Sequence, residues 1–343
     1  MKIQKNVKLA KYTTFHIGGK AKFFAEVKSV EELKKAVDFT KKKKLKIFVL
    51  GGGSNVLLPD KGLPGLVLKI NIKGIKFDNN EHKNKEHVLM YAGAGETWDK
   101  VVAKTVAKNL GGIENLSLIP GTVGGAVYQN IGAYGVELKD VLDFVEVFDK
   151  KDGTLKTLSG PNCRFGYRDS IFQHSEGINY IILDTTLKLS NNPEPKINYP
   201  DLIKYFESKA STISEVRKAV IKIRRSKLVY PNPNVGTAGS FFKNPVVTIS
   251  SFQFLVSRYS DIKGRDIGDD LVKLSAGQLI EKAGWKGERS GKAGVSKKHA
   301  LVLVSNKGAK AKDILKLAKL IQNSVKDKFD IKLEPEVKIV TSG

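Results

Sequence analysis

Short apolar runs alternate with segments of helical periodicity along this chain, a pattern typical of α/β or α+β proteins. Strands are predicted at residues 47–50, 65–70, 88–92, 144–148, 180–189 and 300–305. Helices are predicted from about residue 31 to the lysines at 41–44, and at residues 97–110, 212–226 and 311–329. In the last of these, Ile314, Leu317 and Ile321 recur at the spacing of one buried helical face. The first half of the chain resembles a unit rich in βαβ crossovers.

Helix boundaries and polar connectors suggest how the chain is divided. Thr212 with Glu215, and Ser275 with Gln278, have the spacing of capping boxes that begin helices. Segments 190–195 and 230–234 contain prolines and polar residues, which indicates connectors, and we place a domain boundary near Leu228. The prediction is a region 1–228 with two subdomains, roughly 1–70 and 71–228, a domain 229–330, and a C-terminal segment 331–343.

The length and composition limit the class of protein. A chain of 343 residues with 41% hydrophobic residues can form packed cores in two or three domains. No run approaches the roughly 18–20 apolar residues of a membrane helix, and the N-terminus lacks a signal-peptide core, so we expect a cytoplasmic protein. The single cysteine, Cys163, excludes an internal disulfide, a zinc ribbon and a Cys-x-x-Cys redox site.

The charge balance predicts anionic partners. Lys and Arg number 59 against 35 Asp and Glu, a net charge of +24. Lysines are spread over the whole length, whereas nucleic-acid-binding proteins usually concentrate contact residues on one module. Phosphorylated small molecules therefore fit the excess charge at least as well as nucleic acid.

Two glycine-rich loops are candidate phosphate-binding segments. The first is Gly51-Gly52-Gly53-Ser54-Asn55, and the second contains Pro120, Gly121, Thr122, Gly124 and Gly125 and continues to Asn130, Gly132, Ala133 and Gly135. Glycine lets the backbone approach a pyrophosphate closely, although the same residues also suit tight turns. Neither loop matches the Rossmann or P-loop pattern. Together, the loops suggest an extended anionic ligand that contacts both.

Three further segments carry candidate chemistry. Arg168 beside Tyr167 offers a planar fork for a carboxylate. The alternative is that Arg168 and Asp169 are an ordinary Arg-Asp pair on the protein surface. Ser240, between Gly239 and two phenylalanines, is too weak an acid to protonate anything less basic than a carbanion, and no Gly-x-Ser-x-Gly elbow of a serine hydrolase occurs. Glu336 is one of two acids flanking a proline, where solvated carboxylates are the common outcome.

These segments, in this order and spacing, resemble the UDP-N-acetylenolpyruvoylglucosamine reductase family. The resemblance rests on residues 51–55, 119–135, 165–172, 239–245 and 333–337, and it extends from about residue 12 to 340. Arg168 in Tyr-Arg-Asp-Ser-Ile-Phe, and Tyr199 in Asn-Tyr-Pro-Asp-Leu, are similar to the longer subtype, in which a tyrosine-bearing loop closes over the substrate.

The resemblance implies an α+β fold with an FAD-binding domain of the vanillyl-alcohol-oxidase (PCMH) type, in region 1–228, and a smaller α/β substrate-binding domain. It implies an FAD-dependent oxidoreductase of peptidoglycan precursor synthesis. In this family, NADPH reduces the flavin and leaves, and the enolpyruvyl ether of UDP-N-acetylglucosamine is then reduced to UDP-N-acetylmuramate. Neither glycine-rich loop carries a His or Cys, so non-covalent FAD is expected. The expected partners are NADPH and the UDP-sugar, with no nucleic acid, membrane or metal, and the expected state is a monomer.

The family motifs also imply residue roles. Ser240 corresponds to the proton donor, whose target is a carbanion basic enough for serine. Arg168 and Glu336 correspond to the pair that holds the substrate carboxylate, where Glu336 helps only if it is protonated or acts through a shared proton. The glycine-rich loops correspond to the flavin pyrophosphate cradle, and the substrate contacts correspond to Tyr167, Tyr199, Lys227, Asn244 and His299. His299 stands where the family often has Gln.

Two alternatives follow from the same residues. A flavin oxidase of the same fold, acting on an alcohol or sugar lactone, would need neither Ser240 nor the UDP contacts. A basic nucleic-acid-binding protein would use the net charge but leaves the glycine-rich loops unexplained.

Overall fold

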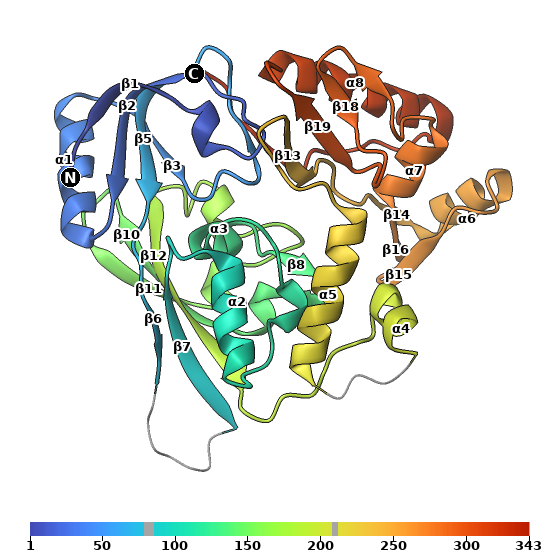
Figure 1. The fold of residues 1–343 in the computed structure, drawn as a ribbon, viewed down its shortest axis with the longest axis horizontal. Coiled ribbons are helices and arrows are strands. Elements are labelled where there is room, and N and C mark those ends of the chain that lie inside the picture. The colour runs from blue at the N-terminus through green and yellow to red at the C-terminus, as the bar shows by residue number, and fades with distance from the viewer. Residues whose placement is uncertain (79–85, 208–211, 343) are drawn as a thin grey trace. The chain divides into compact units, whose positions relative to one another are not determined.

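The computed structural model describes residues 1–78, 86–207 and 212–342 (Figure 1). These residues form two compact units. Unit 1 comprises residues 1–7, 21–52 and 64–224, and unit 2 comprises residues 8–20, 53–63 and 225–343. Unit 2 thus includes two N-terminal segments that the sequence placed in region 1–228, and it also includes the C-terminal segment 331–343.

Unit 1 contains most of the strands. Its main elements are β1 (Gln4–Lys8), β2 (Lys20–Val27), α1 (Val30–Lys42), β3 (Ile47–Leu50), β5 (Leu63–Ile70), β6 (Ile75–Phe77), β7 (His87–Gly93), α2 (Trp98–Ala107), η2 (Glu114–Leu116), α3 (Val123–Tyr128), β8 (Gly132–Ala133), β9 (Val136–Glu137), β10 (Leu142–Asp149), β11 (Leu155–Ser159), β12 (Tyr180–Ser190), α4 (Pro200–Phe206) and α5 (Ile213–Lys227), whose last residues pass into unit 2.

The larger sheet of unit 1 differs from the predicted βαβ arrangement. Its strand order is β11-β10-β12-β7-β6, and every neighbouring pair is antiparallel. The second sheet has the order β1-β2-β5-β3, in which β3 and β5 run parallel. The βαβ prediction was therefore wrong for the larger sheet, because short apolar runs look alike in parallel and antiparallel strands.

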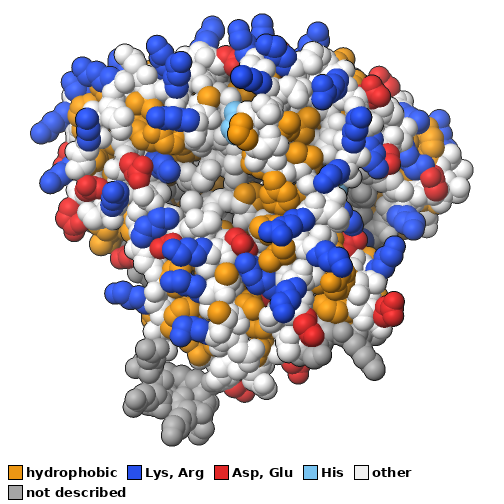
Figure 2. Space-filling model, in the orientation of Figure 1, with side chains coloured by type: hydrophobic (Ala, Val, Ile, Leu, Met, Phe, Trp, Pro, Cys, Tyr) orange, Lys and Arg blue, Asp and Glu red, His pale blue; other side chains and the backbone are white. Residues whose placement is uncertain are grey.

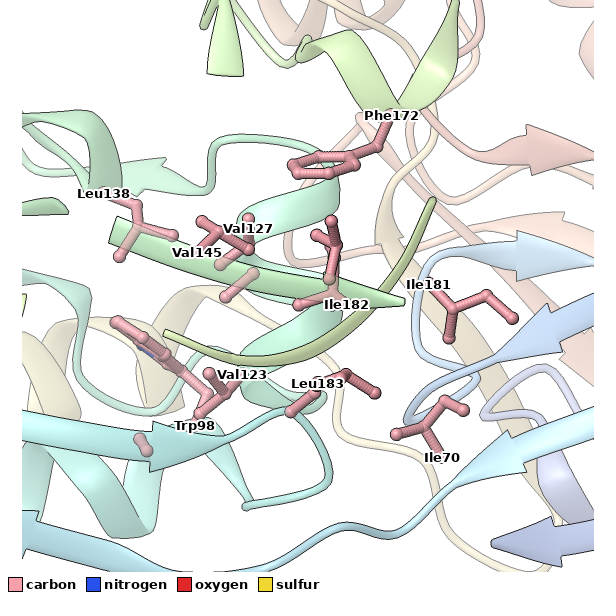
Figure 3. Close-up of a cluster of buried hydrophobic side chains, with 14 of the residues drawn as sticks. Ile70, Trp98, Val123, Val127, Leu138, Val145, Phe172, Ile181, Ile182 and Leu183 are labelled. Carbon is pink, nitrogen blue, oxygen red and sulfur yellow. The ribbon is translucent and has the colours of Figure 1, made fainter. Parts of the chain in front are cut away.

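The core of unit 1 packs α2 and α3 against the antiparallel sheet. Figure 3 shows Trp98 and Val123 from these helices in one cluster with Val145 of β10 and Leu183 of β12. Trp98 is 1% exposed, and its indole N–H donates a hydrogen bond to the carbonyl of Leu116 at 3.0 Å. This pairing satisfies the polar atom of a fully buried ring, so the start of α2 is fixed on the core.

Unit 2 is built around a sheet of order β13-β19-β18-β17. Its elements are β4 (Val56–Leu57), β13 (Val235–Ser240), β14 (Val246–Thr248), α6 (Ile249–Arg258), β15 (Gly264–Gly268), β16 (Leu271–Leu274), α7 (Ala276–Lys282), β17 (Arg289–Ser290), β18 (Ala293–Val295), β19 (Val302–Asn306), α8 (Ala311–Phe329) and β20 (Lys338–Ile339). β4 pairs in parallel with β20. Phe15, Ile17 and Leu57 join the core that α8 covers, which explains why the N-terminal segments belong to this unit.

The predicted helix starts are present with one difference. Thr212 and Glu215 form a reciprocal capping box: each backbone N–H donates to the other's side chain, at 3.0 and 3.2 Å. Ser275 accepts from the N–H of Gln278 at 3.2 Å, but the side chain of Gln278 bonds to other backbone groups instead of returning to Ser275. The second box is therefore only half formed.

Two carboxyl groups face each other on the central strands of unit 1. Glu146 of β10 lies opposite Asp184 of β12. Burial, together with the hydrogen bond to Glu146 and its negative charge, raises the pKa of Asp184 to about 7. The folded state thus holds a proton on Asp184 that the unfolded chain releases near pH 4. The stability contribution of this group falls as the pH rises from about 4 to about 7 and is constant above that range.

We expect Asp184→Asn to raise the melting temperature at pH 8, because it removes the half-buried like-charge pair. The gain over the wild type should grow between about pH 4 and pH 7 and then stop growing, as the linkage requires. Thermal unfolding followed by circular dichroism across this range measures the difference. A difference that does not vary with pH would show that the pair holds no extra proton.

Candidate cofactor and substrate site

Unit 1 contains a cavity of about 280 Å³ at the first glycine-rich loop. Its lining residues are Gly51, Gly52, Lys69, Ile70, Asn71, Lys73, Gly95, Thr97, Gly121 and Thr122. The two predicted loops therefore meet here, although they are about 70 residues apart in the sequence.

The cavity wall has the features of a pyrophosphate cradle. A Cβ on Gly52 would lie 2.6 Å from Cα of Gly121, and one on Gly51 would lie 2.8 Å from Oγ1 of Thr122, so the loops pass too closely for side chains. Thr122 Oγ1 is buried and has no hydrogen-bond partner among the described residues. A buried hydroxyl of this kind needs an acceptor or donor from a ligand or water. These residues fit the diphosphate of FAD.

Several residues that line the cavity were not predicted from the sequence. Lys69, Asn71 and Lys73 lie at and after the end of β5, and Gly95 and Thr97 lie after β7. No motif marked these residues, because only the fold brings the ends of β5 and β7 to residues 121–122. Lys73 Nζ donates a hydrogen bond to the carbonyl of Gly95 and lies 3.9 Å from Glu96. Lys69 and Lys73 bring positive charge to the cavity, which favours an anionic ligand.

Other residues of the predicted cradle do not line this cavity. The N–H of Gly124 donates to Ala94 O at 2.9 Å, and a Cβ there would lie 3.0 Å from Ala94 Cβ, so Gly124 allows α3 to pack closely against Ala94. Pro120, Gly125, Asn130, Gly132, Ala133 and Gly135 are also outside the lining. Their role as direct cofactor contacts stays a prediction.

The first loop divides between the units. Gly51 and Gly52 belong to unit 1, whereas Gly53, Ser54 and Asn55 belong to unit 2. Gly53 has φ of +65° and accepts a hydrogen bond from the N–H of Thr14 at 3.0 Å. A contact of Gly53, Ser54 or Asn55 with the flavin stays a prediction.

In unit 1, Arg168 sits in a tight turn beside the second loop. Its φ of +57° is left-handed, and Nη2 donates to the carbonyl of Gly132 at 2.6 Å. A Cβ on Gly132 would lie 2.9 Å from Arg168 Nη1, so a side chain there would displace the guanidinium from its present position. Asn130, fully buried, donates Nδ2 to Gly166 O at 3.0 Å and ties the same two segments together. Tyr167 lies next to this guanidinium, whose carbon is 5.4 Å from the ring centroid.

Tyr199, also in unit 1, immediately precedes α4. Its ring packs edge-on against Tyr134, with ring centroids 5.3 Å apart. Asn115 donates both Nδ2 hydrogens to backbone carbonyls, those of Tyr134 and Lys196, each at 2.9 Å. The tyrosine-bearing segment is therefore anchored at its base on unit 1.

In unit 2, a backbone irregularity places Ser240. Gly239 has φ of +75°, and the pairing of β13 with β19 shifts between Thr237 and Ser240. Such a bulge redirects the following side chain. The hydroxyl of Ser240 makes no hydrogen bond within the described parts of the chain and is half-buried. It is available as a donor to a ligand.

Glu336 is held next to this strand end. Its N–H donates to Phe241 O at 2.8 Å, and Asn55 Nδ2 donates to the carbonyl of Glu336 at 3.3 Å. Phe242 and Pro335 form an isolated antiparallel bridge. Unit 2 therefore brings the segments of Ser240 and Glu336 together, while Arg168 belongs to unit 1.

The remaining predicted substrate contacts also lie in unit 2. Asn244 Oδ1 accepts from the N–H of Ala276 at 3.0 Å, at the start of α7. His299 Nδ1 accepts from the N–H of Leu301 at 3.2 Å, which leaves Nε2 to carry the proton of the neutral ring. Lys227 is exposed at the end of α5. Their contact with a substrate stays a prediction.

The basic side chains are dispersed on the face of the molecule that Figure 2 shows. Lys and Arg side chains are scattered over the face seen in Figure 2, and no single basic stripe stands out there. The absence of a nucleic-acid partner stays a prediction. Among the described helices, none has the length and apolar character needed to cross a membrane.

Comparisons with known proteins agree with the site. Residues 231–340 match the family model for the C-terminal domain of UDP-N-acetylenolpyruvoylglucosamine reductase, and residues 21–159 match that of an FAD binding domain. UDP-N-acetylenolpyruvoylglucosamine reductases of Pseudomonas aeruginosa and Flavobacterium johnsoniae are 40% and 41% identical to this chain. The first alignment covers 98% of both proteins, and the second covers 99% of this chain and all of the relative. The crystal structure of the reductase from Thermus caldophilus superimposes with a TM-score of 0.69 at 28% identity, over 99% of this chain and 100% of that one.

The predicted fold class is confirmed: an FAD-binding domain precedes a smaller C-terminal domain in a mixed α+β chain. The full-length identity near 40% leaves no segment outside the alignment large enough for a different architecture. This chain is an FAD-dependent oxidoreductase and belongs to the UDP-N-acetylenolpyruvoylglucosamine reductase family.

Proposed function

We propose that this chain reduces the enolpyruvyl ether of UDP-N-acetylglucosamine to UDP-N-acetylmuramate, and that Ser240, Arg168 and Glu336 carry the chemistry. FAD, when bound and reduced by NADPH, would supply a hydride to the terminal alkene carbon. The lining of the unit 1 cavity supports the site of its diphosphate. Lys69 and Lys73 offset the phosphate charge, and Thr122 offers its unpartnered hydroxyl.

The protein's residues complete the reduction by managing charge and a proton. As negative charge moves toward the substrate carboxylate, Arg168 binds it through its guanidinium fork, which the hydrogen bond from Nη2 to Gly132 O orients. Glu336 shares a proton with the same carboxylate, because a bare second anion would repel it. Ser240 gives its hydroxyl proton to the adjacent carbon and regains one from solvent. The observation that best supports this proposal is the bulge at Gly239. It leaves the half-buried hydroxyl of Ser240 without a hydrogen-bond partner in the described residues, next to the segment of Glu336.

We further infer a monomeric, cytoplasmic enzyme with non-covalently bound FAD. Tyr199, Tyr167, Lys227, Asn244 and His299 contact the UDP-sugar in this proposal. Its test for the first two points is a native mass near 37.7 kDa in light scattering and recovery of activity in the cytoplasmic fraction. For the third, yellow colour should leave the protein on denaturation.

An anaerobic stopped-flow experiment tests the function. NADPH should bleach the flavin absorbance, and the enolpyruvyl UDP-sugar should then restore it with one equivalent of product. A flavin oxidase on the same fold would recover its colour with oxygen and ignore the UDP-sugar. That outcome, or a preparation that binds no flavin, contradicts the proposal.

A further inference from the structure

Helices α2 and α5 lie side by side in unit 1 (Figure 1) and are joined by one ion pair. Arg217 of α5 donates Nη1 to Asp99 Oδ1 at 2.7 Å and Nη2 to Asp99 Oδ2 at 3.1 Å. The side chains are 16% and 28% exposed. A two-point contact of this kind fixes the orientation of a carboxylate as well as its charge. Arg217 therefore sets the rotamer of Asp99.

Asp99 uses the same carboxylate to hold a strained backbone. Its Oδ1 accepts the N–H of Leu118 at 2.6 Å, and Leu118 has φ of +59°, a conformation that costs energy for a branched side chain. Arg217 Nη1 also donates to Ser117 Oγ at 2.9 Å. The Asp99–Arg217 pair thus forms hydrogen bonds with Ser117 and Leu118, which precede the second glycine-rich loop.

The charge of Asp99 persists in the folded protein. Burial alone would raise the pKa of Asp99, but hydrogen bonds from Arg217 and from the N–H of Leu118, with the positive charges of Arg217 and Arg224, bring it below its ordinary value. The hydrogen bond to Leu118 is therefore charge-assisted throughout the neutral range.

The segment from Leu116 to Gly121 is fastened to the start of α2 at three points. Trp98 holds both ends, because its indole N–H binds Leu116 O at 3.0 Å and its backbone N–H binds Gly121 O at 3.1 Å. Asp99 holds Leu118 in the middle. Gly121 and Thr122, which come next, line the cavity. Of the three fastenings, the middle one alone depends on a residue outside α2, namely Arg217.

We propose that Asp99 and Arg217 are positioning residues for the FAD diphosphate: they set the path of residues 118–122 so that Gly121 and Thr122 face the cofactor. This inference rests on the proposed cradle. The alternative is a purely structural role, in which the Asp99–Arg217 pair only holds α5 against α2. The geometry favours positioning, because the carboxylate that pairs with Arg217 also accepts the N–H of the left-handed Leu118, a contact that packing α5 against α2 would not require.

Titration of the apoprotein with FAD, followed by flavin fluorescence, tests the proposal without any turnover. Arg217→Gln should weaken FAD binding about tenfold, since sub-ångström errors in a supporting shell cost this much. Arg217→Lys, which keeps the charge but loses the fork, should fall between Gln and wild type. Asp99→Asn, which keeps an oxygen for the Leu118 N–H, should lose less affinity than Asp99→Ala.

Lys156→Gln is the matched control. It breaks an ion pair in the same unit with Asp149, whose side chain is 7% exposed, and touches neither loop. It should lower the melting temperature and leave the dissociation constant of FAD unchanged. If Arg217→Gln does not fold, the Lys variant and the Asn/Ala comparison at Asp99 carry the test.

Two results would overturn the inference, and they distinguish failure of the positioning role from failure of the proposed cradle. If Thr122→Val weakens FAD binding while folded Arg217 and Asp99 variants bind as wild type, the cradle stands and the positioning role fails. If Thr122→Val also binds FAD normally, the cradle assignment itself is wrong, and the positioning role fails with it.

Discussion

We expect Ser240→Ala to separate the two halves of the reaction. NADPH should still bleach the flavin at the wild-type rate, because the proposed cradle lies in unit 1 and contains no part of β13. Recovery of the colour by the enolpyruvyl UDP-sugar should slow by about 10³-fold, since a positioned proton donor contributes about 10²–10⁴-fold. Anaerobic stopped-flow absorbance, with NADPH first and substrate second, measures both steps on one sample.

Ser257→Ala provides the control for this variant. Ser257 is exposed on α6, and its hydroxyl donates to Phe254 O at 2.8 Å, so its loss should leave both steps unchanged. A Ser240→Ala enzyme that reoxidises at the wild-type rate would remove Ser240 from the proton-donor role. Slowing of both steps together would instead indicate a structural effect.

The second large effect is expected for Gly52→Ala, which should lose FAD. The added Cβ would lie 2.6 Å from Cα of Gly121, so two backbones must separate and the cavity wall must change. A displacement of this size should weaken FAD binding by about 10²-fold. Binding is measured by fluorescence titration of the apoprotein, and circular dichroism should show that the variant keeps its fold.

Gly153→Ala distinguishes a local clash from general glycine strain. Gly153 has φ of +83° in the turn between β10 and β11, and a Cβ there would meet no atom within 4 Å. The change should cost about 1 kcal/mol of stability through backbone strain alone. FAD affinity should not change. Equal loss of affinity in both variants, or normal affinity in Gly52→Ala, would contradict the cradle.

Helices and strands were predictable where their sequence pattern was strong and contiguous. Helix α8 spans the predicted residues 311–329 because its apolar spacing is regular, and β3 spans the predicted residues 47–50 because glycine ends it. Strand direction was not predictable, since an apolar run does not encode its partner. Strand β15 was not predicted, because all of its residues are exposed and no buried face gives its sequence an alternating pattern.

The candidate site was only partly predictable. Glycines revealed the two loops, because their density is unusual in any sequence. Lys69 and Asn71 were missed, because no local pattern shows that the end of β5 meets residues 121–122. Gly124 lies close to Ala94, a packing contact that only the three-dimensional neighbours of a glycine reveal, and its contact with the cofactor stays a prediction.

The composition of unit 2 has a consequence for synthesis on the ribosome. Its core needs Phe15, Ile17 and Leu57 together with residues of α8, and β4 finds its parallel partner only in β20. All segments of unit 1, by contrast, have been made once residue 224 is added. Unit 1 can therefore fold during translation, while residues 8–20 and 53–63 keep their apolar side chains exposed until α8 and β20 have been synthesised.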